Sequence, residues 1–304
     1  MAKIAFLFPG QGAQVCGMGQ DFYDTYPVAK EVYDTAKEAT GIDVAQLCFT
    51  PNEQLNITEY TQIALLTTEV AILKVVESMG IKADYAAGLS LGEYGALAAA
   101  KVCGMSDLFK LIRARGLYMQ EEYPVGGAMT AVLGLDADKI KEVCDSVEGI
   151  VSIANDNCPG QIVITGEEAA VTKAGEMLKE AGARRCVPLT VSGPFHSKLL
   201  EGAGKKLAGE LASVEISAPQ IPYICNVTAD VVDEAANIKE LLEKQVSSPV
   251  RFRESILKLK ELGVDTFIEM GPGKTLSGFV RKTDKELRVI NIEKVEDLER
   301  LKEL

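Results

Sequence analysis

The sequence predicts an α/β protein with a mostly parallel sheet and a smaller inserted unit, and three observations lead to this class. Short apolar runs alternate with helical patterns along most of the chain, which is the order of a parallel sheet covered by helices on both faces. A different order of strands and helices interrupts this alternation between residues 125 and 191. The chain has 304 residues, of which 47% are hydrophobic, so it is long enough to bury a substantial core.

The elements of the large part follow from apolar runs and helical periodicity. The first expected strand, residues 3–8, is a continuous apolar run that suits a parallel strand buried on both faces, and it enters the tight turn Pro9-Gly10-Gln11-Gly12. Helices are expected at 21–40 and at 60–79, where apolar residues recur at helical spacing. The remaining expected elements are a strand at 84–87, helices from 92 and over 106–121, and strands at 223–227, 266–270 and 288–292.

The inserted unit has the order strand-helix-strand-strand-helix-strand, which is that of a ferredoxin-like βαββαβ module. Its expected strands are 128–135, 150–154, 161–165 and 185–191, and its expected helices are 136–147 and 168–181. We therefore divide the chain into a large α/β domain, 1–124 with 192–304, and an inserted subdomain, 125–191. The expected hinges are Gly126-Gly127 and Ser192-Gly193-Pro194.

Composition and charge argue against several classes of function. The formal net charge of −12 disfavours non-specific binding to nucleic acid, because neutralising phosphates requires clustered Lys and Arg. No apolar stretch has the length of a transmembrane helix, and residues 1–20 lack a basic region and a cleavage site. The seven Cys include no C-x-x-C pair, so neither a disulfide framework nor a metal site is expected. We expect a cytoplasmic monomer without a membrane contact.

The pentapeptide Gly88-Leu89-Ser90-Leu91-Gly92 lies between an expected strand and an expected helix. That context is typical of a nucleophile elbow, the sharp turn that lifts a serine hydroxyl above the sheet in α/β-hydrolase-like domains. In such a turn the amide of Leu91 is placed to donate to an oxyanion. The alternative is a tight Gly-rich turn with a capping serine, and the pentapeptide alone does not separate the two.

His196 is the only histidine of the chain, so it is the only imidazole that could act as a base for Ser90. It follows Ser192-Gly193-Pro194-Phe195 and precedes an apolar stripe of helical spacing between Leu199 and Leu211. We expect the start of this helix to disfavour the imidazolium and to keep a neutral base available. The alternative is a surface or capping histidine.

Arg115 projects from the apolar face of its expected helix, because apolar residues lie three, four and seven positions away from it. These residues are Leu108, Leu111, Ile112 and Met119. A buried guanidinium requires an anionic partner. One interpretation is an internal salt bridge to Asp or Glu, which periodicity alone favours. The other is bidentate capture of a substrate carboxylate, for which the planar guanidinium is suited.

Several motifs occur in the order found in one enzyme family. They are Pro9-Gly10-Gln11-Gly12-Ala13-Gln14, Thr61-Gln62-Ile63-Ala64, Gly88-Leu89-Ser90-Leu91-Gly92-Glu93-Tyr94, Arg115-Gly116-Leu117-Tyr118-Met119-Gln120, 155–166, Phe195-His196-Ser197, 245–250 and Gly271-Pro272-Gly273. Together they closely resemble the malonyl-CoA:acyl carrier protein transacylases of fatty-acid synthesis. The resemblance spans nearly the whole chain.

This resemblance implies a ping-pong transfer of malonyl from malonyl-CoA to the phosphopantetheine thiol of acyl carrier protein. Ser90 would attack the malonyl thioester, and His196 would be its base. Arg115 would bind the malonyl carboxylate, with Gln62 nearby. One thioester is exchanged for another, so no cofactor and no metal are expected, and malonyl-CoA is a substrate.

The resemblance also implies supporting roles. The amides of Gln11 and Leu91 would form the oxyanion hole, and the main-chain carbonyl of Gln245 would orient the imidazole. Many members of the family have His where this chain has Leu89, so no role of that neighbouring imidazole is transferred. The positions associated with the pantetheine arm, the CoA phosphates or the approach of the carrier protein are Asn155, Asn157, Arg184 and Arg185.

Acyl carrier protein is acidic, as this chain is, so docking requires a local basic surface. We expect that surface beside the last strand of the inserted subdomain and the helix after His196. Its residues are Arg184, Arg185, Lys198, Lys205 and Lys206.

Two other functions remain open from the sequence. An α/β-hydrolase esterase also uses a Gly-x-Ser-x-Gly elbow, but its histidine normally lies late in the chain, whereas more than a hundred residues follow His196. A non-catalytic protein that binds or scaffolds acyl carrier protein would keep the fold without the chemistry. The sequence also leaves open whether methylmalonyl is accepted and whether the pathway is fatty-acid or polyketide synthesis.

Overall fold

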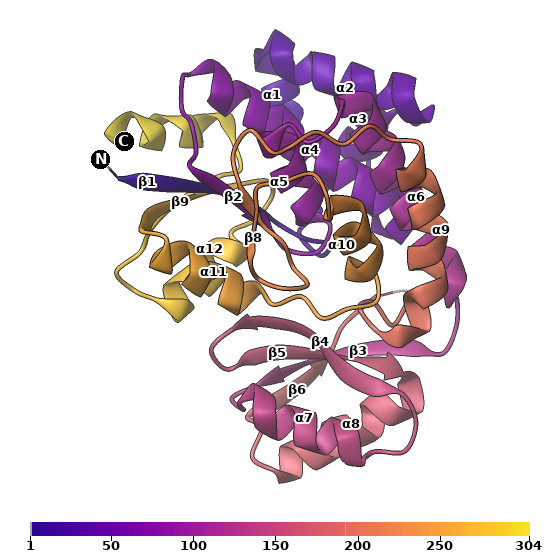
Figure 1. The fold of residues 1–304 in the computed structure, drawn as a ribbon. Coiled ribbons are helices and arrows are strands. Elements are labelled where there is room, and N and C mark those ends of the chain that lie inside the picture. Colours follow the sequence, from indigo (N-terminus) through magenta and orange to yellow (C-terminus); the bar gives the residue numbers. More distant parts are fainter. Residues whose placement is uncertain (1, 192) are drawn as a thin grey trace.

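The computed structural model describes residues 2–191 and 193–304, and two sheets organise it (Figure 1). The strands of the larger sheet are β1 (Lys3–Phe8), β2 (Tyr85–Gly88), β7 (Tyr223–Ile224), β8 (Val231–Val232), β9 (Val264–Met270) and β10 (Arg288–Ile292). Their order is β10-β9-β1-β2-β7-β8. Every pair is parallel except β7 with β8, which confirms the mostly parallel sheet that the sequence predicts.

Helices cover the larger sheet on both faces. They are α1 (Gln20–Thr25), α2 (Pro27–Thr40), α3 (Val44–Phe49), α4 (Thr58–Ser78), α5 (Gly92–Ala100), α6 (Met105–Glu122), α9 (Glu201–Ala212), α10 (Ile238–Gln245), α11 (Phe252–Glu261) and α12 (Thr275–Thr283). Short 3₁₀ turns are η1 (Gln54–Asn56), η2 (Lys198–Leu200) and η3 (Val295–Glu303). In the part of the chain that the structure describes, no helix combines the length and apolarity needed to cross a membrane.

Strand β1 lies inside the larger sheet and separates two apolar cores. Phe6 and Phe8 point into the core that the N-terminal helices build, including α2, α4 and α6. Ala5 and Leu7 point to the opposite side, into a second core with α11 and α12. Figure 1 shows these two groups of helices on either side of the sheet. The continuous apolar run of β1 is explained by burial on both faces.

Some expected elements differ in extent from those observed. The single helix expected over 21–40 is two helices, because Tyr26 is extended and Pro27 starts a new helix. Strand β7 has two residues instead of the expected 223–227, because the chain turns back at Cys225, whose amide donates to the Asp230 carbonyl at 3.2 Å.

The smaller sheet belongs to the inserted unit, which contains β3 (Gly127–Leu133), α7 (Ala137–Ser146), β4 (Val151–Cys158), β5 (Gln161–Glu167), α8 (Glu168–Glu180) and β6 (Arg185–Pro188). All three strand pairs are antiparallel, and the order is β4-β5-β3-β6. This is the ferredoxin-like arrangement that the sequence predicts. Strand β4 is longer than the expected 150–154, and β6 is shorter than the expected 185–191.

The inserted unit has a core of its own between its sheet and the helices α7 and α8. Figure 1 places it beside the larger sheet, where the far end of β4 approaches the segment after α10. The Val250 amide donates to the Ala154 carbonyl at 2.8 Å, and the Asp156 amide donates to the Val250 carbonyl at 2.9 Å. The domain boundaries stay a prediction, and the expected hinge at Ser192 lies outside the described residues.

The turn from β2 into α5 depends on close contact with the end of β1. A Cβ built on Gly92 would lie 2.1 Å from the carbonyl oxygen of Phe8 and 2.6 Å from that of Pro9. A Cβ on Gly88 would lie 2.0 Å from the Gly92 backbone. Both glycines are therefore required by the approach of backbone to backbone.

We predict that Gly92→Ala destabilises the protein by about 2–3 kcal/mol, because the added methyl group must push two segments of buried backbone apart. Gly209→Ala is the matched control, since Gly209 lies on α9 and a Cβ there meets nothing within 4 Å. That substitution is expected to stabilise by about 0.5–1 kcal/mol. Urea unfolding monitored by circular dichroism measures both, and equal midpoints for the two variants would contradict the packing argument.

Candidate active site

Ser90 lies at the turn between the end of β2 and the start of α5. The strand-turn-helix context predicted for the elbow is therefore present. Ser90 adopts the left-handed conformation with φ of 56°, which is unusual for a residue with a side chain. Such strain persists only where the surrounding structure holds it, and it is common at sites that do chemistry.

His196 meets Ser90 directly. Its Nε2 lies 2.7 Å from Ser90 Oγ, although the two residues are 106 positions apart in the chain. Its Nδ1 donates to the carbonyl oxygens of Gln245 at 2.9 Å and Ser248 at 3.1 Å. Because Nδ1 carries the hydrogen, Nε2 is left as an acceptor for the serine proton. The structure thus brings together the two residues that the sequence paired.

Burial lowers the pKa of His196 to about 4, and the nearby charge of Arg115 acts in the same direction. The two carbonyl acceptors raise it, but by less. The imidazole is only 3% exposed. The helical stretch after His196 begins with η2 at Lys198 and continues as α9 from Glu201, so the expected effect of its N-terminus on the imidazole stays a prediction. Desolvation and a neighbouring cation both favour the neutral imidazole.

Arg115 is buried and 1% exposed, and its acceptors are all uncharged. Nη1 donates to Gln62 Oε1 at 2.6 Å. Nη2 donates to Gln245 Oε1 at 2.9 Å and to Ser90 Oγ at 3.2 Å. Its Nε has no partner among the described residues. Of the two interpretations left open by the sequence, a direct salt bridge to Asp or Glu is not found in the described chain.

The carboxamide of Gln245 links Arg115 to an acidic group, Glu93. Gln245 Nε2 donates to Glu93 Oε2 at 2.7 Å, while the same carboxamide accepts from Arg115 through Oε1. Burial raises the pKa of Glu93 to about 7, against the opposing hydrogen bonds from Gln245 and Asn226. The carboxylate is therefore a weak compensation for the guanidinium, and burial lowers the pKa of Arg115 as well.

A pocket of about 190 Å³ opens above the serine. Its apolar lining includes Leu89, Met119, Met129, Val163, Phe195 and Phe279, and its polar lining includes Gln11, Gln62, Asn155 and Asn157. Ser90 and His196 line it too, while Arg115 contacts it from behind through its bonds to Ser90 and Gln62. The pocket therefore joins a serine hydroxyl, an imidazole and a buried cation in a mostly apolar space.

Leu91 and Gln11 flank Ser90 in this pocket. Leu91 is the N-cap of α5, and its amide has no acceptor within the described chain. The side chain of Gln11 donates to Thr58 Oγ1 at 3.1 Å, which fixes the loop after β1. No backbone acceptor is found for the amide of either residue in the described chain, and their role as an oxyanion hole stays a prediction.

The structure separates the remaining predicted residues into two groups. Asn155 and Asn157 line the pocket from β4, and Asn157 Oδ1 is buried without a donor in the described chain. Arg184 and Arg185 are exposed at the start of β6 and do not line the pocket.

Three polar groups near Ser90 were missed by the sequence analysis. Gln245 was expected to contribute its carbonyl, but its carboxamide also bridges Ser90, Glu93 and Arg115. Glu93 and Asn226 were not singled out, and both are buried beside the elbow. The position of Glu93 within the elbow motif was a usable signal. Asn226 is an isolated residue and no pattern marks it.

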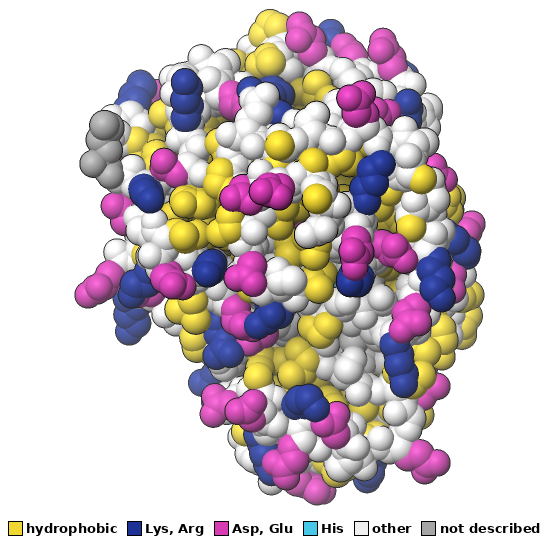
Figure 2. All heavy atoms as spheres, viewed as in Figure 1, with side chains coloured by type: hydrophobic (Ala, Val, Ile, Leu, Met, Phe, Trp, Pro, Cys, Tyr) yellow, Lys and Arg dark blue, Asp and Glu magenta, His cyan; other side chains and the backbone are white. Residues whose placement is uncertain are grey.

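The surface that we expected to be basic carries acidic side chains as well. Lys198, Lys205 and Lys206 are exposed, but Lys206 pairs with Glu122 at 2.8 Å. On the face drawn in Figure 2, Lys and Arg side chains are interspersed with Asp and Glu.

Comparisons with known proteins agree with this geometry. The acyl transferase domain family matches residues 5–302. A malonyl CoA-acyl carrier protein transacylase from Bacillus subtilis (strain 168) is 49% identical, over 98% of this chain and 96% of that protein. One from Staphylococcus aureus (strain MRSA252) is 41% identical, over 98% of each.

Solved structures give the same result. The malonyl CoA-acyl carrier protein transacylase from Clostridium perfringens superposes with a TM-score of 0.96 at 45% identity, covering 99% of this chain and 96% of that one. A malonyl-transacylase in complex with a type II polyketide acyl-carrier protein superposes with a TM-score of 0.95 at 39% identity, covering 98% of each chain. The chain therefore belongs to the acyl transferase domain family and, within it, to the malonyl CoA-acyl carrier protein transacylases.

Proposed function

We propose that this acyltransferase moves malonyl from malonyl-CoA to the phosphopantetheine thiol of acyl carrier protein, through an ester on Ser90, in fatty-acid biosynthesis. The observation that carries the proposal is the buried Arg115, which has only uncharged acceptors and lies 3.2 Å from the serine hydroxyl. A guanidinium in such a position requires an anion, and malonyl carries a free carboxylate close to its thioester.

In the first half-reaction His196 Nε2 takes the proton of Ser90 Oγ, and Oγ attacks the thioester carbonyl. The negative charge that develops on the carbonyl oxygen is stabilised by the amides of Gln11 and Leu91. When the carbon–sulfur bond breaks, His196 returns the proton to the departing CoA thiolate. The product is a malonyl ester on Ser90.

The second half-reaction reverses these steps with a different thiol. His196 takes the proton of the pantetheine thiol, and the sulfur attacks the malonyl ester. The carbon–oxygen bond breaks, and Ser90 regains the proton from His196. Because one thioester is consumed and one is formed, the reaction needs neither an energy source nor a cofactor.

Arg115 selects malonyl over acetyl. The carboxylate replaces acceptors that satisfy the guanidinium poorly, and an acetyl group leaves the buried charge as it was. Gln62 holds one arm of the guanidinium and thereby fixes its plane. The side chains of Asn155 and Asn157 are assigned to the pantetheine arm, since both line the pocket.

Docking of the acidic carrier protein is assigned to Arg184, Arg185, Lys198, Lys205 and Lys206, all of which are exposed. Lys206 is the only one of the five that forms an ion pair within the described chain, which leaves Arg184, Arg185, Lys198 and Lys205 unpaired. Their reversal to Glu is expected to raise the KM for carrier protein and to leave acylation by malonyl-CoA unchanged.

Intact-protein mass spectrometry after brief exposure to malonyl-CoA tests the acyl-enzyme. We predict a gain of one malonyl group on the wild type and none on Ser90→Ala, because no other hydroxyl in the described pocket contacts His196. Consumption of malonyl-CoA without an adduct, together with release of free malonate, would instead indicate a hydrolase. No adduct and no consumption, with carrier protein still bound, would indicate a scaffold.

Arg115→Ala is predicted to reduce kcat/KM for malonyl-CoA by about 100-fold or more, since a buried charge-assisted pair is worth about 3 kcal/mol. Acetyl transfer is expected to change far less. The matched control is Arg113→Ala, which removes a guanidinium from the same helix. Arg113 pairs with Glu59 at 2.7 Å and does not line the pocket. An equal loss with both acyl groups would count against recognition of the carboxylate.

The pH dependence of acylation follows from the lowered pKa of His196. The base acts when neutral, so kcat/KM is expected to stay flat between about pH 5 and pH 8 and to fall only towards the pKa of about 4. Arg115→Gln, assayed with acetyl-CoA, should shift the inflection to higher pH by removing one cause of the lowering. An inflection near the ordinary value of 6.5 in the wild type would contradict the assignment.

A further inference from the structure

Asn226 connects two parts of the nucleophile elbow. Its Oδ1 accepts from the Ser90 amide at 2.7 Å, and its Nδ2 donates to the Gly88 carbonyl at 2.7 Å. These two backbone groups lie on either side of Leu89, so one carboxamide fixes both ends of the turn. Asn226 is 1% exposed and comes from the loop after β7, 136 residues from Ser90 in the chain.

The elbow has to be held in place by its neighbours because its backbone is strained. A residue with a side chain pays about 1–2 kcal/mol to adopt the left-handed conformation seen at Ser90. The same backbone sets the direction of Ser90 Oγ and of the Leu91 amide that follows. Removing the carboxamide would also leave the Gly88 carbonyl and the Ser90 amide without partners in a buried place.

Hydrogen bonds to buried side chains hold Asn226 in place. Its amide donates to Glu93 Oε2 at 3.1 Å, and Gln245 Nε2 donates to the same oxygen at 2.7 Å. Gln245 Nε2 also lies 2.9 Å from the Ser90 carbonyl. The carboxylate of Glu93 thus ties Asn226 to the residue that orients His196 and contacts Arg115.

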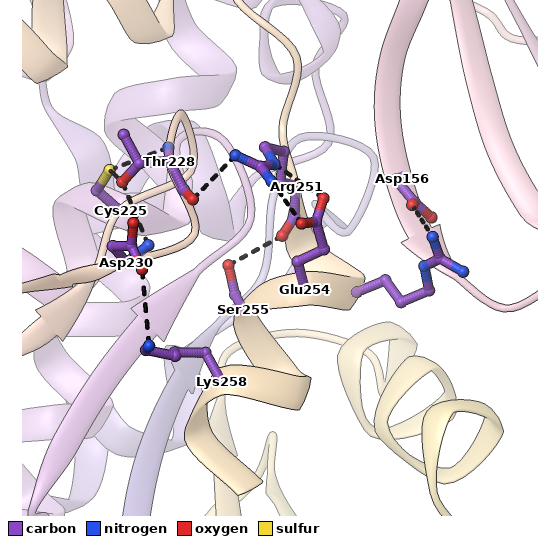
Figure 3. Close-up of polar contacts among 9 residues, drawn as sticks. Asp156, Cys225, Thr228, Asp230, Arg251, Glu254, Ser255 and Lys258 are labelled. Atoms are coloured by element: carbon purple, nitrogen blue, oxygen red, sulfur yellow. Dashed lines mark hydrogen bonds and ion pairs between the residues drawn. The ribbon is translucent and has the colours of Figure 1, made fainter. Parts of the chain in front are cut away.

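The exterior side of the loop, 225–230, is anchored to α11 and the residue before it (Figure 3). The Arg251 amide donates to the Asn226 carbonyl at 3.0 Å, and Arg251 Nη1 donates to the Thr228 carbonyl at 3.0 Å. Figure 3 shows that Glu254 holds the guanidinium and that Lys258 faces Asp230. With both sides fixed, the carboxamide has little freedom to move with the elbow.

We propose that Asn226 is a positioning residue that holds the backbone of Ser90 in its reactive conformation. It touches no substrate and acts through the geometry of Oγ and of the Leu91 amide. The inference rests on the proposed function of Ser90 as the nucleophile. It predicts a defect in the reaction of the serine with any electrophile, whatever the acyl group.

The experiment compares Asn226→Ala with the wild type in the full chain, using malonyl-CoA and acetyl-CoA. We expect kcat of acylation to fall about 100-fold for both, with KM changed less than about threefold, because the nucleophile is misplaced while the pocket is intact. The matched control is Asn52→Ala, since Asn52 also bridges backbone groups but does not line the pocket. Its kcat should equal that of the wild type.

Two further measurements separate a positioning role from a role in substrate binding. The rate of labelling of Ser90 by a fluorophosphonate should fall in parallel with kcat, since that reagent carries no carboxylate and needs no carrier protein. Asn226→Asp keeps an acceptor for the Ser90 amide and is expected to lose less than Asn226→Ala. It also serves as the test variant if Asn226→Ala does not fold.

Three results would overturn the inference. One is unchanged kcat and labelling in a folded Asn226 variant. Another is a loss confined to KM, and the third is a loss confined to malonyl-CoA, because either would place Asn226 in substrate binding. If the wild type is labelled by the fluorophosphonate but not acylated by malonyl-CoA, the proposed function fails, while the labelling rates still decide the role of Asn226.

Discussion

The burial of one guanidinium without a carboxylate partner is the constraint on which the site depends. Arg115 donates to the amide oxygens of Gln62 and Gln245 and to the hydroxyl of Ser90. Neutral acceptors hold its position without cancelling its charge, so the charge remains available to a ligand. The same charge contributes to the low pKa of His196, which keeps the imidazole unprotonated near neutral pH.

Gln245 contacts both Arg115 and His196. Its carbonyl accepts from His196 Nδ1, while its carboxamide contacts Arg115, the Ser90 carbonyl and Glu93. The main-chain carbonyl of Gln245 accepts from the imidazole in place of an acidic side chain. The imidazole is therefore oriented without a negative charge beside it. An acid there would raise the pKa of His196 and would also compete with a substrate carboxylate for the guanidinium.

The site is assembled from segments that are distant in the chain, and packing between the two sheets aligns them. Strand β4 of the inserted unit bonds to Val250 through Ala154 and Asp156. That contact places Asn155 and Asn157 in the pocket wall and holds the segment whose Gln245 and Ser248 carbonyls receive His196. The inserted unit is therefore part of the scaffold that holds His196 as well as one wall of the pocket.

The sequence alone determined the α/β class, the βαββαβ order and the pairing of Ser90 with the only histidine, because these depend on local periodicity, glycine positions and residue counts. It also placed Arg115 on a buried helix face. It did not reveal the break at Pro27, the shortness of β7, or the part played by Asn226 and the Gln245 side chain. Those were decided by contacts between residues far apart in the chain, where burial and hydrogen-bond geometry, which no local pattern encodes, set the outcome.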